Sequence, residues 1–295
     1  MICKFLGTSG AQGFPPIYGR NDFYTSLREE EPDEVRTRTG FRIGREHQID
    51  LSPDIAYQLR RYGSDMYDIR HLLITHTHAD HFAPQELFDA LSMCSEEPAS
   101  TNTAPINLYL STAAHEWLID RYLPVHHGFL NKKRLKDLEQ FLNIHCINYF
   151  ESFRAGDLEV DAVKGNHHAL GVNESALNYL VHSPSRSILL AWDTGFYQDD
   201  TWEYLQGKRA DTVVMEATFG PWKDRGHMND THMNFDTFHN QLEKMSKIGF
   251  IDSNTRIYAT HISSALHMSH QHLQAQLDTY GFGTLLAKDE LEFQF

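Results

Sequence analysis

Four side chains that can bind a metal ion follow one another in the stretch His76-Thr77-His78-Ala79-Asp80-His81. The apolar run from Leu72 to Ile74 just before it predicts a buried strand. Because side chains alternate along an extended backbone, His76 and His78 can point the same way and share one ion. Asp80 and His81 are adjacent and would diverge, which suits a second ion nearby. Imidazole and carboxylate donors favour zinc, manganese or iron.

Chance clustering is the competing explanation, since the chain contains 19 histidines. The H-x-H-x-D-H spacing directly after an apolar strand favours ligands instead. Later predicted strands also end on ligand-type residues, and this repetition carries more weight than any single residue. These residues are His167 or His168 after the strand 158–164, Asp193 after the strand 187–191, and His261 after the strand 256–260.

The composition predicts a globular, acidic chain. It has 295 residues, of which 41% are hydrophobic and 12% aromatic, enough for a sizeable core in a single domain spanning 1–295. The formal net charge of −14 argues against a general nucleic-acid surface, because neutralising phosphates requires clustered Lys and Arg. One basic cluster, 131–136, is interpreted as a solvated helix face.

We expect a cytoplasmic protein. The opening residues 1–6 resemble a strand rather than a signal peptide, and no apolar run is long enough to span a bilayer. The cysteines Cys3, Cys94 and Cys146 are far apart and contain no C-x-x-C pair, so neither a disulfide framework nor a cysteine metal site is predicted.

The remaining pattern alternates strands and helices. A strand over 2–6 leads into the glycine-rich loop 7–13, which lets backbone approach a ligand closely. The charged stretch 15–38 predicts an excursion loop, and 124–142, which includes His126 and His127, predicts a helical insertion. Strands prevail from 144 onward, and 256–260 is the last strand expected.

The ligand-type residues, taken together, resemble the ligand order of the metallo-β-lactamase superfamily. The resemblance implies an α/β fold, a four-layer αβ/βα sandwich with two metals between the inner sheet edges. It implies one ion at His76, His78 and His167, a second ion at Asp80, His81 and His261, and Asp193 as the bridge. His167 is preferred over His168 because Gly165-Asn166-His167 resembles the N-H step of the family.

Further motifs resemble the phosphodiesterase branch, especially the cyclic phosphodiesterase of the carbon–phosphorus lyase pathway. The loop 7–13, Trp192-Asp193-Thr194 and Thr260-His261-Ile262-Ser263 resemble its G-T-x-G-A-Q-G, S-D-T and T-H-I-S. The stretch 215–219 resembles the E-A-T-F of the tRNA 3′-processing endonucleases. The cysteine-bearing structural zinc loop of the cyclic phosphodiesterase has no counterpart here.

A further histidine of that branch corresponds to His232, at the start of a helix predicted over 230–242. In the first helical turn, His232 would lie beside free backbone N–H groups that favour phosphate oxygens. It is the candidate proton donor and substrate ligand, with His227 as the alternative and helix capping as the competing role. Asp80 is a second candidate catalytic residue, and Gly10 and Gln12 are candidate substrate contacts.

The resemblance implies a dinuclear metal-dependent hydrolase, a phosphodiesterase that attacks a small, possibly cyclic, phosphodiester with a metal-bridging hydroxide. Zinc or manganese is the expected metal, with iron as a further option. The alternatives are a tRNA 3′-end nuclease, a lactonase or other ester hydrolase, and a metal-binding sensor without turnover. Family members commonly pair, so a homodimer is implied, although the residues themselves leave the oligomeric state open.

Overall fold

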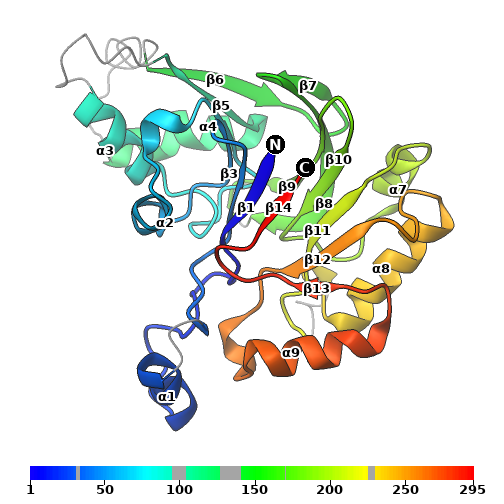
Figure 1. The fold of residues 1–295 in the computed structure, drawn as a ribbon. Helices are drawn as coiled ribbons and strands as arrows, with labels where there is room; N and C mark the ends of the chain where they lie inside the picture. The colour runs from blue at the N-terminus through cyan, green and yellow to red at the C-terminus, as the bar shows by residue number, and fades with distance from the viewer. Residues whose placement is uncertain (31–33, 95–103, 127–140, 170, 225–229) are drawn as a thin grey trace.

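The computed structural model describes residues 1–30, 34–94, 104–126, 141–169, 171–224 and 230–295. Within this part of the chain, two seven-stranded sheets face each other and helices cover their outer faces (Figure 1). Apolar side chains fill all three spaces between the layers. This arrangement is the predicted four-layer sandwich.

The first sheet is built mainly from the N-terminal half of the chain. Its strands, in spatial order, are β14 (Glu292–Gln294), β1 (Ile2–Gly7), β2 (Gly40–Ile43), β3 (His47–Ile49), β4 (His71–Leu73), β5 (Ile106–Ser111) and β6 (Leu142–Ile147). The alternation of side chains sends Leu72 outward to the helices α2 (Ile55–Arg61), α3 (Pro84–Cys94) and α4 (Thr112–Trp117), and Leu73 inward to the other sheet.

The second sheet comes from the C-terminal half. Its strands, in spatial order, are β13 (Leu285–Leu286), β12 (Arg256–Thr260), β11 (Thr212–Glu216), β10 (Ser187–Ala191), β9 (Glu174–His182), β8 (Leu158–Ala169) and β7 (Ser152–Ala155). Leu190 faces the first sheet, whereas Leu189 packs in the outer core. That core also contains side chains from the helices α7 (Asp199–Leu205), α8 (Phe235–Lys247) and α9 (His270–Leu277).

Parallel pairing determines where the loops meet. The strands β3 to β6 run parallel to one another, and so do β10, β11, β12 and β13. The carboxyl ends of parallel strands lie at one edge of their sheet, so the residues after β4, β10, β11 and β12 can converge.

The structure differs from the predicted elements in several places. The excursion 15–38 contains the helix α1 (Asp22–Glu30), which is stabilised because Tyr24 and Leu27 pack with Phe14. The helical segment after β5 is not uniform, since α4 is followed by a π-helical turn (Leu118–Tyr122) and by α5 (Leu123–His126). The strand 256–260 is not the last, since β13 and β14 follow it. The strand β7 was not predicted.

Some predicted features lie outside the described residues. These are His127, the basic cluster 131–136, most of the insertion 124–142, and His227. In the described segments, no helix combines the length and the apolar character needed to cross a membrane.

Candidate metal centre

Three histidines and one aspartate bring a first set of donor atoms together. The set contains His76, His78, His167 and Asp193, whose ligand atoms lie within 4.8 Å of one another. Nδ1 of His78 lies 3.0 Å from Nε2 of His76 and 3.1 Å from Nε2 of His167. His76 and His78 follow β4, whereas His167 lies in β8 after a register shift. The structure thus joins residues from both sheets.

A second set lies beside the first and shares Asp193. It contains Asp80, His81, Asp193 and His261, again with ligand atoms within 4.8 Å of one another. Nε2 of His81 lies 3.3 Å from Nε2 of His261. Oδ2 of Asp193 lies 3.2 Å from Nε2 of His76 and 2.8 Å from Nε2 of His81, so this carboxylate stands between the two sets.

Hydrogen bonds on the far side of each ring fix which nitrogen faces the centre. Four Nδ1 atoms have such a partner: His76 with Thr75 Oγ1 at 3.1 Å, His81 with Asp50 Oδ2 at 2.7 Å, His167 with the Thr231 carbonyl at 3.1 Å, and His261 with Thr218 Oγ1 at 3.0 Å. The Thr75 and Thr218 hydroxyls donate to the carboxylates of Asp50 and Glu216, so they accept from the rings. In these four histidines, Nε2 is therefore the nitrogen that faces the centre.

This arrangement fits divalent cations. Ring nitrogens of facing histidines lie 3.0–3.3 Å apart across the centre, a spacing at which they share either a proton or a cation. Two nitrogens that bind one tetrahedral zinc ion at ~2.0–2.1 Å are themselves about 3.3 Å apart. Oδ1 of Asp193 is buried and lies 3.1 Å from Nε2 of His261, without the geometry of a hydrogen bond.

The ionisation of the rings agrees with such a role. Burial lowers the pKa of His76 well below its usual range and that of His167 to about 4, which keeps both in the neutral form that binds metals. Burial also acts on His81, but the Asp193, Asp80 and Asp50 carboxylates outweigh it and raise its pKa well above the usual range. In the absence of a cation, a proton on His81 supplies the positive charge.

Backbone conformation directs two of these side chains. Asp193 and His261 follow β10 and β12 with φ values of 55° and 57°, in the left-handed region that residues with a Cβ rarely adopt. The surrounding bonds hold this conformation, since Thr194 N–H donates to Glu216 Oε1 at 2.7 Å. Unfavourable backbone geometry of this kind is concentrated at functional sites.

His232 forms an ion pair with Glu216 beside the two sets. Its Nδ1 lies 2.9 Å from Oε1 of Glu216, a wholly buried residue at the end of β11. Burial alone would lower the pKa of His232, but the Glu216 carboxylate outweighs this and raises it to about 9. The predicted first-turn position is wrong, because Asn234 caps α8 by accepting from Thr237 N–H and α8 begins at Phe235. His232 lies before the helix.

A pocket of about 300 Å³ opens over the donor atoms. His232, Asp80 and Asp193 line it, and Gly10 and Gln12 of the glycine-rich loop form part of its wall. A Cβ atom on Gly10 would lie 3.3 Å from the ring of His261, so the absence of a side chain lets this loop approach the donor atoms closely.

Comparison with known proteins identifies the family. Residues 43–247 match the family described as anti-Pycsar protein Apyc1. The chain belongs to the anti-Pycsar Apyc1 family. No curated protein sequence matches it significantly.

Solved structures show the fold of this Apyc1-family chain. A diphosphatase from the PhnP family is 22% identical with a TM-score of 0.70, covering 100% of this chain and 96% of that one. The metallo-β-lactamase fold protein YhfI from Bacillus subtilis is 15% identical, with a TM-score of 0.67 and coverage of 99% and 98%. Human tRNase Z, short form, is 18% identical, with a TM-score of 0.64 and coverage of 100% and 99%.

These structures confirm the predicted metallo-β-lactamase fold, an αβ/βα sandwich.

The structure brings the predicted donor residues together and places the two adjacent histidines differently. His167 enters the first set, whereas His168 is exposed and contacts Ser175. Sequence reasoning missed Asp50, which follows β3 directly. It also missed Glu216, which lies inside the quoted E-A-T-F pattern.

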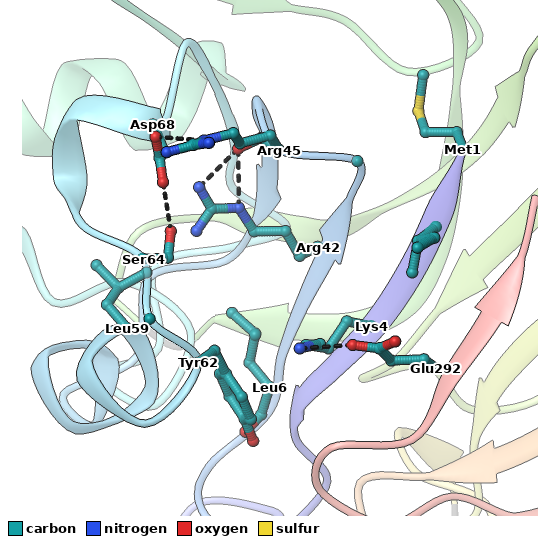
Figure 2. A pocket seen from close by; sticks show the side chains of 13 residues that line it. Met1, Lys4, Leu6, Arg42, Arg45, Leu59, Tyr62, Ser64, Asp68 and Glu292 are labelled. Carbon is teal, nitrogen blue, oxygen red and sulfur yellow. Dashed lines mark hydrogen bonds and ion pairs between the residues drawn. The ribbon is translucent and has the colours of Figure 1, made fainter.

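A larger cavity, of about 470 Å³, lies elsewhere on this Apyc1-family chain (Figure 2). Its charged side chains pair mainly with neighbouring protein groups: Lys4 with Glu292, Arg45 with Asp68, and Arg42 with the Arg45 carbonyl. It contains none of the metal-site donors, so the chemistry is assigned to the smaller pocket.

Proposed function

We propose that this protein is a dinuclear metal-dependent phosphodiesterase that hydrolyses a small phosphodiester, with cyclic phosphodiesters as the first class to test. The observation that carries the proposal is the pair of donor sets sharing Asp193 at the base of a pocket that also exposes His232. Two ions side by side suit a displacement in which attacking and leaving oxygens both need stabilisation.

Each donor set would hold one ion. His76, His78 and His167 would hold the first, Asp80, His81 and His261 the second, and Asp193 would bridge them. When bound, the ions activate water at neutral pH and polarise a phosphoryl oxygen. Zinc and manganese suit the imidazole and carboxylate donors.

The protein's own residues would direct the proton transfers. Asp80 lines the pocket and can accept a hydrogen bond from the attacking water. His232 carries a proton at neutral pH because Glu216 stabilises its charged form, and Nε2 is the nitrogen left to donate that proton to the leaving alkoxide. Proton donation of this kind typically accelerates a reaction by a factor of ~10²–10⁴.

The size and charge of the site favour a small substrate. A pocket of about 300 Å³ accommodates a compact phosphodiester, and the net charge of −14 opposes binding along an extended RNA. The likeness to a diphosphatase of the PhnP family supports phosphoryl chemistry.

A substrate panel tests the proposal. Metal-loaded protein would be assayed on cyclic phosphodiesters, bis(p-nitrophenyl) phosphate, linear oligonucleotides and lactones, with His78→Ala as the inactive control. We expect hydrolysis of small phosphodiesters and its loss in the variant. Turnover of lactones alone would assign an ester hydrolase instead, and turnover of oligonucleotides alone would assign a nuclease. Metal binding without turnover of any compound would indicate a sensor.

A further inference from the structure

Glu174 is a buried carboxylate that contacts Thr77, the residue between His76 and His78. It begins β9 and is 1% exposed. Its Oε2 accepts from the Thr77 backbone N–H at 2.9 Å and from the Thr77 hydroxyl at 2.8 Å, and its Oε1 accepts from the Ser111 hydroxyl at 2.5 Å. Both carboxylate oxygens of Glu174 therefore accept hydrogen bonds.

Thr77 stands between His76 and His78, two members of the first set. Glu174 holds this residue by its backbone and its side chain together, which restricts rotation of the loop about Thr77. Ser111, the other partner, caps α4 by accepting from Ala114 N–H at 3.0 Å. The carboxylate thus connects the ligand loop to β9 and to the start of α4.

Glu174 places a carboxylate next to the loop that carries His76 and His78. Its hydrogen-bond partners, Thr77 and Ser111, are neutral, and no ion pair within the described residues involves it. The first set contains one carboxylate, Asp193, which it shares, whereas the second set adds Asp80. A buried negative charge behind His76 and His78 therefore favours a cation at the set that has fewer carboxylates of its own.

Other residues support the second set, although one of them, Asp50, also bonds Thr75, whose hydroxyl contacts His76. Asp50 bonds His81, and the Thr218 hydroxyl bonds His261 and Glu216. None of these bonds involves Glu174.

We propose that Glu174 is a positioning residue that selectively strengthens the binding of the ion held by His76, His78 and His167. The inference rests on the proposed pair of ions, but it does not depend on the substrate.

Metal binding measured without substrate tests this role. Metal-free wild type and Glu174→Gln would be titrated with cobalt(II) and with zinc against a competing chelator. Substitution of residues that support metal ligands typically weakens affinity ~10–100-fold. We expect a loss of that size for one ion only, with the second ion bound as in wild type. The cobalt spectrum of the remaining single ion should match that of His78→Ala and differ from that of His261→Ala.

Two matched variants separate positioning from general destabilisation. Asp161 is likewise buried and bonds three side chains, those of Ser152, His182 and Lys208, but it lies outside both donor sets. Asp161→Asn should lower thermal stability and keep both ions. Thr218→Val should weaken the other ion.

The proposal is overturned if Glu174→Gln binds both ions as wild type does, or loses both together as its thermal stability falls. Wild type that binds fewer than two ions would overturn it as well. Should Glu174→Gln not fold, Thr77→Val, which removes one of the three bonds, must weaken the same single ion. Wild type that binds two ions without hydrolysing any phosphodiester would contradict the proposed function and leave this inference intact.

Discussion

Oε1 of Glu216 lies 2.9 Å from Nδ1 of His232, and the other oxygen of the same carboxylate accepts from Thr218, whose hydroxyl contacts Nδ1 of His261. A single buried carboxylate therefore orients the proposed proton donor and a proposed metal ligand. Glu216 therefore fixes the positions of His232 and His261 relative to each other, and a movement at the end of β11 would displace both rings.

Replacing His232 by Ala should slow hydrolysis most for substrates with poor leaving groups. An alkoxide needs a proton as it departs, whereas p-nitrophenolate leaves readily without one. We expect a loss in kcat of ~10²–10⁴ for an alkyl phosphodiester and a much smaller one for bis(p-nitrophenyl) phosphate. Equal losses for both compounds would show that His232 binds a phosphate oxygen and donates no proton to the leaving group.

Glu216→Gln should shift the alkaline limb of the kcat profile to lower pH. The protonated form of His232 is the active one, so activity falls as pH rises through its pKa. Since the Glu216 carboxylate raises that pKa toward about 9, removing the negative charge lowers it. The pH dependence of kcat for wild type and variant measures the shift. An unchanged alkaline limb would mean that another group controls it.

Adjacent histidines in β8 offer a matched pair of substitutions. His167→Ala should remove one metal equivalent and abolish turnover, because its Nε2 faces the first donor set. His168→Ala should retain metal content and activity, because this exposed ring lies outside both donor sets and bonds the Ser175 hydroxyl. Elemental analysis and initial rates would be compared. Loss of metal in His168→Ala would reverse the assignment.

The buried carboxyl of Asp289 should make the metal-free protein more stable as pH falls from 6 to 4. Burial raises its pKa to about 6 from the model-compound value of 3.8. The folded state therefore keeps this proton in a range where the unfolded state loses it, and protonation favours folding. The difference between the two pKa values corresponds to roughly 3 kcal/mol in the free energy of unfolding.

Urea unfolding at several pH values checks this contribution. Asp289→Asn should lack the gain in stability on acidification relative to wild type, whereas Glu290→Gln, a substitution at a half-exposed neighbour, should keep it. An identical pH dependence in wild type and Asp289→Asn would contradict the prediction.

Local signals predicted the donor atoms because the ligands are encoded next to apolar strands. His76 to His81 stand directly after β4, and Asp193 and His261 stand just beyond β10 and β12. A strand followed by a ligand-type residue is visible in the sequence, and parallel pairing then places several such residues at one edge.

The supporting residues could not be found in this way, because their roles depend on contacts between distant segments. Asp50 meets His81 across the parallel pair β3 and β4, and Glu174 meets Thr77 from the opposite sheet. The start of α8 was misplaced because the apolar spacing of its buried side chains does not define the cap at Asn234. The helix α1 was not predicted, because its sequence is rich in charged residues and its stability depends on packing against Phe14.

The initial rate of cyclic phosphodiester hydrolysis, measured as metal is added to the metal-free protein, tests the central claim most directly. Two donor sets sharing Asp193 predict a rate that rises until two equivalents of metal per chain are bound and then stays constant. A rate that reaches its maximum at one equivalent, or no hydrolysis at two, would contradict a dinuclear phosphodiesterase.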